Sequence, residues 1–243
     1  MRAVKLGVIT AILLLLTACA GTYRSYIEMY KFVLNPAQDA VLTYEQVTTT
    51  GHDFLYVRNG ERPRAVLGLR FIEQQQLKWL AGDNAMLVTQ GGRVTKTLGL
   101  ENDLLYVSNL ISDPLPQAQT AAGLGINSLN NARWLRATDW QSGEYGLVIE
   151  SRFTVIPNQS LTFFDQAITV HKVIETLTVQ DKPTYWRFDG TWQNIFWLDA
   201  ATGRVLQSHQ QLTPAAQPIE LIFISEVARQ FQRAGIQIAA EAI

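Results

Sequence analysis

The sequence predicts an all-β protein: an antiparallel meander of about a dozen strands closed into a deformed barrel, with a short N-terminal helix. Three observations predict this fold. Short runs rich in Val, Leu, Thr and aromatic residues recur along most of the 243 residues. Turn-forming Gly and Asn residues separate these runs at short intervals. One open sheet of so many strands would leave long unpaired edges, so we expect it to curl and close.

The first 18 residues predict a lipoprotein signal peptide. Arg2 and Lys5 precede an apolar run over 6–16. This run is too short to cross a bilayer as a helix, which takes roughly 20 residues. The following Leu-Thr-Ala-Cys resembles the lipobox of bacterial lipoproteins. The resemblance implies cleavage between Ala18 and Cys19, attachment of diacylglycerol to the Cys19 thiol, and acylation of the new amino terminus by a fatty acid such as palmitate.

This lipid anchor predicts where the protein is located. Three acyl chains exceed the two signals that stable membrane anchoring requires. In the enterobacterial rule the residue after the acylated cysteine decides sorting, and here it is Ala20 rather than Asp. We therefore expect a protein anchored in the outer membrane and facing the periplasm. The alternative is an ordinary secretory signal in which Cys19 is incidental.

Length, charge and cysteine content limit the class of protein further. Without its first 18 residues the chain keeps 18 basic and 21 acidic residues, a net charge of −3. This balance argues against a nucleic-acid partner. Cys19 is the only cysteine, so an internal disulfide is excluded. We predict a signal peptide over 1–18, a lipidated N-terminus with a short helix over 19–35, and a single barrel-like domain over 36–243.

The elements follow one another along the chain. Apolar residues at helical spacing, from Tyr23 to Leu34, predict a helix that Asn35-Pro36 ends. Beyond it, Gly- and Asn-rich turns separate strands predicted at 40–48, 53–58, 65–71, 76–81, 85–90 and 94–98.

Residues 112–131 interrupt the strands, because they hold two prolines and two glycines but few large apolar residues. We expect a long excursion from the domain, with a helical turn near 117–122. Later strands are predicted at 133–140, 145–156, 168–179, 184–188, 191–198, 204–210 and 219–225. Asp189-Gly190 is the clearest hairpin signal, and a terminal helix is predicted over 226–233, with Gly235 as its stop.

The common catalytic motifs are absent from the sequence. It has no Gly-x-Ser-x-Gly elbow, no phosphate-binding Gly-rich loop and no His-Glu-x-x-His. His52, His171 and His209 lie far apart in sequence, so we predict no metal site and no cofactor.

Carboxylates could still form the pair that a glycan-cleaving enzyme needs. The candidates are Glu73, Asp83, Glu101, Asp103, Asp165, Glu175, Asp189 and Asp199. Four of them occupy turn-like positions, where Asp accepts hydrogen bonds from the backbone: Asp83, Asp103, Asp189 and Asp199.

Aromatic residues cluster in the second half of the chain. Their faces stack on sugar rings, so Trp186, Trp192 and Trp197 are candidate glycan contacts. The alternative is that these rings fill the barrel. In a strand over 191–198, Trp192 and Phe196 face one side and Trp197 faces the other. At least one of these rings should therefore be incompletely buried.

Two strings of the sequence resemble those of the YjbF/GfcB family of bacterial lipoproteins. The strings are GGRVTKTLGL at 91–100 with Asp103-Leu104, and NIFWLD at 194–199 with TGRV at 202–205, Ser208 and Gln210. The resemblance covers nearly the whole chain after Cys19, and it is weakest at 112–131 and after Pro218. It implies a meandering antiparallel sheet closed into a deformed barrel. It also implies a role in secreting or assembling exopolysaccharide or group 4 capsule, and it supplies no catalytic residue.

Three hypotheses of function follow. The first is a non-enzymatic accessory factor for surface polysaccharide, held in the membrane by lipid, that binds glycan or a neighbouring export protein. The second is a barrel that carries a lipid or another apolar ligand. The third is a glycan-modifying enzyme, which requires two carboxylates in one cleft.

Overall fold

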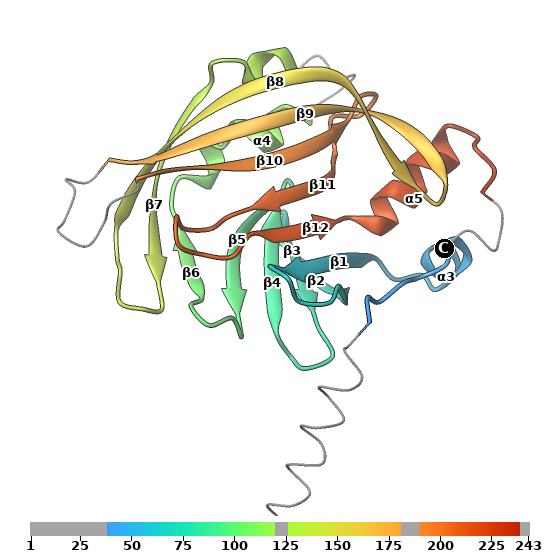
Figure 1. Ribbon diagram of the computed structural model, residues 1–243, viewed down its shortest axis with the longest axis horizontal. Coiled ribbons are helices and arrows are strands. Elements are labelled where there is room, and N and C mark those ends of the chain that lie inside the picture. The colour runs from blue at the N-terminus through green and yellow to red at the C-terminus, as the bar shows by residue number, and fades with distance from the viewer. Residues whose placement is uncertain (1–37, 120–125, 181–189, 239–243) are drawn as a thin grey trace, which may run out of the picture. The chain divides into compact units, whose positions relative to one another are not determined.

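Within the described residues, twelve antiparallel strands form one sheet that curls into a nearly closed barrel (Figure 1). This computed structural model describes residues 38–119, 126–180 and 190–238, and Ala40–Ile243 form one compact unit. The expected signal peptide with Ala18, Cys19, the expected N-terminal helix and the strand expected over 184–188 all lie outside the described residues. The strands are β1 (Phe54–Asn59), β2 (Ala65–Glu73), β3 (Gln76–Leu80), β4 (Met86–Gln90), β5 (Arg93–Leu98), β6 (Leu104–Val107), β7 (Arg133–Trp140), β8 (Leu147–Phe163), β9 (Gln166–Val179), β10 (Thr191–Asp199), β11 (Val205–Gln210) and β12 (Ile219–Ile222).

The predicted all-β meander is confirmed, because strands that follow one another in sequence pair in the sheet. Pairing of β1 with β12 connects the two ends of the meander and leaves β5 and β6 as the edges. Side chains bridge this seam: Thr97 Oγ1 donates to Asp103 Oδ1 at 2.8 Å and accepts from the backbone N–H of Leu104 at 2.9 Å. The barrel is therefore nearly closed without a continuous ladder of backbone hydrogen bonds.

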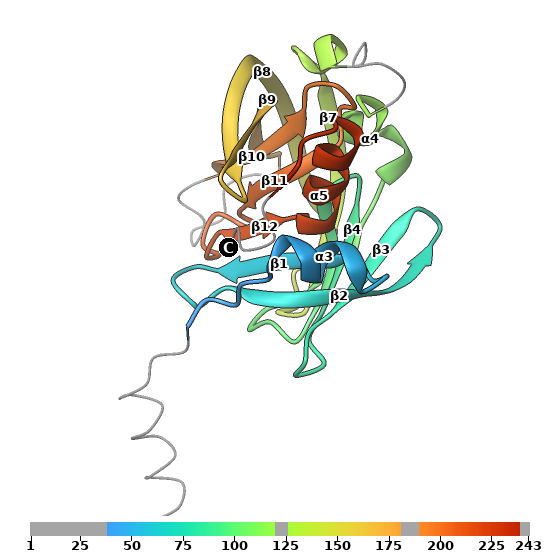
Figure 2. The ribbon, with the colours of Figure 1, turned by 90° about the vertical axis from the view of Figure 1, so that its right-hand side faces the viewer.

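A second apolar core lies outside the barrel. Strands β8 and β9 extend beyond the barrel wall and arch over helices α3 (Tyr44–Thr49) and α5 (Ile224–Arg233) (Figures 1 and 2). Phe164, at the tip of this arch, packs against Tyr44 edge to face, with 5.3 Å between ring centroids. Val227 and Phe231 of α5 are fully buried in the same cluster. In the described part of the chain, no helix is long and apolar enough to cross a membrane.

The helix α3 corrects the strand expected over 40–48. Thr43 caps this helix, since its hydroxyl accepts from the N–H of Gln46 while the Gln46 side chain accepts from the N–H of Thr43. This reciprocal capping satisfies two backbone donors at the start of the helix. The strand prediction relied on β-propensity, which takes no account of such capping bonds.

Other differences concern the bounds of elements. The short strand β6 was not predicted. Strand β8 was expected to stop at Ile156, but it continues past Pro157 because the register shifts there. Strand β12 ends at Ile222, and the expected terminal helix begins at Ile224 rather than Glu226.

One end of the barrel is covered by the excursion expected at 112–131. The 3₁₀ helix Leu110–Ser112 leads into it, and its described residues form the helix α4 (Pro114–Gln117) and the 3₁₀ helix Ile126–Leu129. The helical turn thus starts earlier than predicted, and residues 120–122 of the prediction lie outside the described residues. Leu115 and Ala118 are fully buried in the main core. A Cβ on Gly203, in the β10–β11 turn, would lie 2.6 Å from the carbonyl oxygen of Ala118. This close approach shows that the excursion packs tightly on the barrel end.

The barrel interior is filled by side chains. The inward-facing residues alternate along each strand with residues that face outward. The largest buried rings of this core are Trp79, Trp134, Trp140, Phe153 and Phe196.

Candidate binding site

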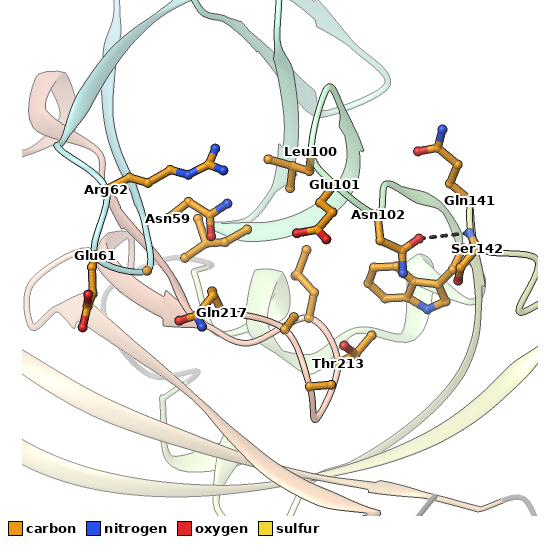
Figure 3. Close-up of a pocket in the computed structure, with 16 residues that line it drawn as sticks. Asn59, Glu61, Arg62, Leu100, Glu101, Asn102, Gln141, Ser142, Thr213 and Gln217 are labelled. Carbon is orange, nitrogen blue, oxygen red and sulfur yellow. Dashed lines mark hydrogen bonds between the residues drawn. The ribbon is translucent and has the colours of Figure 1, made fainter. Parts of the chain in front are cut away.

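The turns at the other end of the barrel surround a pocket of about 1130 Å³. Figure 3 shows its two walls. One wall is formed by the β5–β6 and β7–β8 turns, which are joined by a hydrogen bond of 3.0 Å from the N–H of Ser142 to Asn102 Oδ1. The other wall is formed by the β1–β2 and β11–β12 turns, joined by a bond of 2.9 Å from the N–H of Gly60 to the carbonyl oxygen of Pro218. Each wall is thus cross-linked within itself.

Polar side chains at the mouth of this pocket lack partners. Among the described residues, none forms a hydrogen bond or an ion pair with the side chains of Asn59, Glu61, Arg62, Glu101, Thr213 or Gln217. The Arg62 and Glu101 side chains extend from opposite walls into the mouth, whereas Glu61 points away from it (Figure 3). Such donors and acceptors can bind a polar ligand without first breaking an internal bond.

The floor of the pocket is apolar and packed. Trp140 and Ile219 reach it from β7 and β12, and Leu212 reaches it from the β11–β12 turn. Trp140 is only 2% exposed, and its Nε1 donates to Thr138 Oγ1 at 3.1 Å. The floor therefore separates the pocket from the barrel interior rather than offering a free ring face.

Below this floor, a network of buried charges crosses the barrel. Arg93 of β5 donates from Nε to Asp113 at 2.6 Å and from Nη1 to Glu175 at 2.7 Å. Glu175 of β9 also accepts from Ser151 at 2.5 Å and from Asn194 at 3.0 Å. Asp113, the N-cap of α4, ties that helix to the network. The network thus joins four strands, β5, β8, β9 and β10, and the excursion that covers the barrel end.

A second arginine in the network makes the number of buried cations equal to the number of buried carboxylates. Arg136 of β7 donates to Ser151 at 2.6 Å and lies 3.5 Å from Glu175. The guanidinium carbons of Arg93 and Arg136 lie 4.5 and 4.2 Å from the ring centroid of Trp134. Two arginines therefore face two carboxylates, and the indole gains cation–π contacts with both guanidinium groups.

These carboxylates are arranged for stability rather than for acid–base chemistry. Burial of Glu175 raises its pKa, but the charges of Arg93 and Arg136 outweigh burial and lower the pKa to about 2. Burial lowers the pKa of Arg136 to about 10, against the attraction of Glu175. A general acid needs a raised pKa to hold a proton near neutral pH. Glu175 is instead fixed in its charged form.

Glu175 should make folding sensitive to acid. Its pKa is about 2 in the folded state and 4.5 by default in the unfolded chain, so its contribution is complete above pH 4.5 and is lost as the pH falls toward 2. The contribution at neutral pH is about 3 kcal/mol. We expect Glu175→Gln to flatten the fall in unfolding free energy between pH 5 and pH 2, as measured by urea unfolding at each pH. Parallel profiles for both proteins would contradict this assignment.

The space inside the barrel is too small for an apolar ligand. Between the charge network and the pocket floor lies a cavity of about 20 Å³, lined by Arg93, Arg136, Trp140 and Leu212 among others. A volume of this size holds about one water molecule. The hypothesis of a barrel that carries a lipid therefore does not fit this interior.

The tryptophans predicted as glycan contacts lie on different faces. Trp192 faces inward, is 7% exposed, and donates from Nε1 to the carbonyl oxygen of Gln211 at 2.7 Å. Trp197 faces outward, is half-buried, and packs edge to face on His209 with 4.9 Å between centroids. Trp186 lies outside the described residues. Glycan contact by these rings stays a prediction, and neither Trp192 nor Trp197 lines the large pocket.

The histidines and the other carboxylates do not gather into one site. No group of three or more His, Cys, Asp or Glu side chains that could hold a metal is present among the described residues. Three of the predicted turn carboxylates do accept backbone hydrogen bonds: Asp83 from Ala85, Asp103 from Gly99 and Leu100, and Asp199 from Thr202. Asp189 lies outside the described residues.

The sequence interpretation missed both the charge network and the pocket. The signal available for the network was an arginine at an inward position of a strand, since Arg136 lies between Trp134 and Thr138 in alternation. For the pocket, the residues involved looked like ordinary turn residues, and only the closure of the barrel brings them together.

Comparison with known proteins places this barrel in a family. The family model described as "Group 4 capsule polysaccharide lipoprotein gfcB, YjbF" matches residues 27–224. The chain belongs to the YjbF family. It is similar to the uncharacterized lipoprotein GfcB of Escherichia coli (strain K12), with 33% identity over 87% of this chain and 94% of GfcB. It is also similar to the uncharacterized lipoprotein YjbF of the same strain, with 30% identity over 88% of this chain and 94% of YjbF.

A solved structure supports the same fold. The crystal structure of the hypothetical lipoprotein YmcC from Escherichia coli (K12) matches with a TM-score of 0.64 and 31% identity, over 81% of this chain and 94% of YmcC. The predicted resemblance to the YjbF family is thus confirmed. In this chain, the strings that resemble the YjbF family form tight contacts of the barrel. Gln210, for example, accepts from the N–H of Val94 at 3.0 Å and donates to the carbonyl oxygen of Gly92 at 2.9 Å.

Proposed function

We propose that this protein is a lipid-anchored, non-catalytic accessory factor in the secretion or assembly of capsule or exopolysaccharide, and that it binds glycan in the pocket at the open barrel end. The observation that carries this proposal is the set of unpaired polar side chains around that pocket. Membership in a capsule lipoprotein family supports the polysaccharide role. In the part of the chain that the structure describes, the interior is packed and the opposite end is covered, whereas this mouth is open to a ligand.

The arrangement of carboxylates favours binding over catalysis. Glu61 and Glu101 both line the pocket, but they lie on different walls and Glu61 points away from the mouth (Figure 3). Glycoside hydrolysis needs two carboxylates that flank one bond. Asp113 and Glu175 are buried and both bind Arg93, so neither is free to protonate a leaving group. We expect the purified protein to leave the chain length of its polysaccharide unchanged.

The lipid anchor and its sorting signal can be tested by two substitutions in the full chain. We expect Cys19→Ala to abolish labelling by radioactive palmitate and to leave the signal peptide attached, because the acyl acceptor is absent. We expect Ala20→Asp to keep the label but move the protein to the inner-membrane fraction. Palmitate labelling and sucrose-gradient fractionation measure both results. Unchanged fractionation of Ala20→Asp would contradict outer-membrane sorting by this residue.

Deletion of the gene tests the function itself. We expect the deletion to reduce surface polysaccharide, measured by immunoblotting of extracted polysaccharide, and expect the wild-type gene to restore it. Complementation by Cys19→Ala should fail even where the domain accumulates, since the proposal requires anchoring. Unchanged surface polysaccharide in the deletion strain would overturn the proposed role.

A further inference from the structure

We propose that the pocket at the open barrel end binds an uncharged oligosaccharide segment and that Glu101 excludes acidic sugars. This inference rests on the proposed function and adds the class of ligand. It starts from the charged residues that line the pocket in the described part of the chain, which are Arg62, Glu61 and Glu101. The lining thus carries a net negative charge, and Glu101 points into the mouth (Figure 3).

The types of side chain at the mouth suit hydroxyl groups. Asn59 and Gln217 each offer a donor and an acceptor, Arg62 offers only donors, and Glu101 offers only acceptors. A sugar hydroxyl both donates and accepts, so it can pair with any of these groups. Since none of them has an internal partner among the described residues, their hydrogen-bonding capacity remains available to a ligand. Hydrogen bonds to the charged groups would be the stronger ones.

Charge distinguishes between neutral and acidic polysaccharide. A uronate or phosphate group placed in the mouth would face the unpaired carboxylate of Glu101, and like charges brought together in an interface oppose binding. Arg62 is the one cation of the lining among the described residues, and Glu101 extends into the mouth from the opposite wall (Figure 3). An uncharged sugar avoids this repulsion and still accepts from Arg62 and donates to Glu101.

The shape of the pocket limits how a polymer can enter. Trp140, Leu212 and Ile219 close its floor, and the space beyond them is the cavity of about 20 Å³. A polysaccharide therefore cannot thread through the barrel. The pocket, at about 1130 Å³, exceeds the roughly 300–1,000 Å³ of typical small-molecule sites. It is large enough for a chain end or a short segment of several sugar rings.

The experiment measures binding of the mature lipoprotein in detergent to an array of oligosaccharides. The probes are neutral hexose and N-acetylhexosamine oligomers, uronate- or phosphate-bearing oligomers of equal length, and fragments of the bacterium's own surface polysaccharide. We expect neutral probes to bind and acidic ones to bind at least about tenfold more weakly. Glu101→Gln should weaken binding of the neutral probe by about tenfold, because a charge-assisted hydrogen bond is lost, and should narrow the preference against acidic probes.

Two controls separate these effects from misfolding. Asp165→Asn removes one exposed carboxylate at the tip of the β8–β9 arch, outside the pocket, and should leave both affinities unchanged. Each variant should also keep the melting temperature of the wild type. Tighter binding of acidic probes, no binding of any probe, or an unchanged preference in Glu101→Gln would overturn the inference.

The outcome also separates this inference from the proposed function. Loss of surface polysaccharide on deletion without glycan binding would overturn the inference alone and point to a protein partner. Glycan binding with unchanged surface polysaccharide on deletion would instead overturn the proposed role while supporting the ligand class.

Discussion

Arg93→Leu is expected to destabilise the protein by about 3–5 kcal/mol, because it leaves two buried carboxylates with a single cation. Arg93 is 3% exposed and binds both Asp113 and Glu175. Its loss also frees the N-terminus of α4 from the barrel wall. Equilibrium urea unfolding followed by tryptophan fluorescence measures the change, and Trp134 lies directly against the guanidinium group.

A matched surface arginine provides the control for this substitution. Arg133 pairs with Glu150 at 2.8 Å, but its side chain is 62% exposed, so Arg133→Leu should destabilise the protein far less than Arg93→Leu. Adding Asp113→Asn to Arg93→Leu should recover part of the lost stability, because the remaining buried carboxylate, Glu175, still has Arg136 as its partner. Equal losses for Arg93→Leu and Arg133→Leu would contradict a stabilising role for the network.

Gly92→Ala is expected to cost about 2–5 kcal/mol for two reasons. Gly92 has a φ of +90°, which an alanine adopts only with strain. Its Cβ would also lie 2.5 Å from the Cβ of Val205, a branched side chain that cannot rotate away. The melting temperature and the urea midpoint should both fall.

Gly143 separates the strain from the clash. It has nearly the same φ, +93°, but a Cβ there would meet nothing within 4 Å. Gly143→Ala should therefore cost only the backbone strain, about 1–2 kcal/mol. Val205→Gly removes the Cβ and both methyl groups, so Gly92→Ala should cost less in a Val205→Gly background than in the wild type. If Gly92→Ala and Gly143→Ala lowered the free energy of unfolding equally, the close approach of Gly92 to β11 would contribute nothing to stability.

Much of the barrel was predictable because its signals are local. The run at 133–140 matches β7 residue for residue, since a half-buried strand alternates in its own sequence. Asp199 marked the β10–β11 turn, because an Asp at a turn accepts a backbone hydrogen bond, here from the N–H of Thr202. The strand expected over 40–48 was wrong because the capping of Thr43 by Gln46 outweighs β-propensity there.

The candidate site was not predictable in the same way. Arg93, Asp113 and Glu175 lie far apart in sequence, and their contact depends on barrel closure and on the path of the excursion. The pocket requires four turns, separated by strands, to meet at one barrel end. The pattern of residues within one segment does not predict these contacts between segments that are distant in sequence.

The sequence by itself determined the kind of strand and the position of most turns, and it predicts the lipobox around Cys19, because each depends on neighbouring residues. The tertiary structure alone decided which charged residues are paired with an opposite charge and which stay available to bind a ligand. Glu175 and Glu101 are the same residue type, yet one is fully buried among two arginines and the other is unpaired at the pocket mouth. Burial and the surrounding charges determine what a carboxylate can do, and both depend on how distant segments pack.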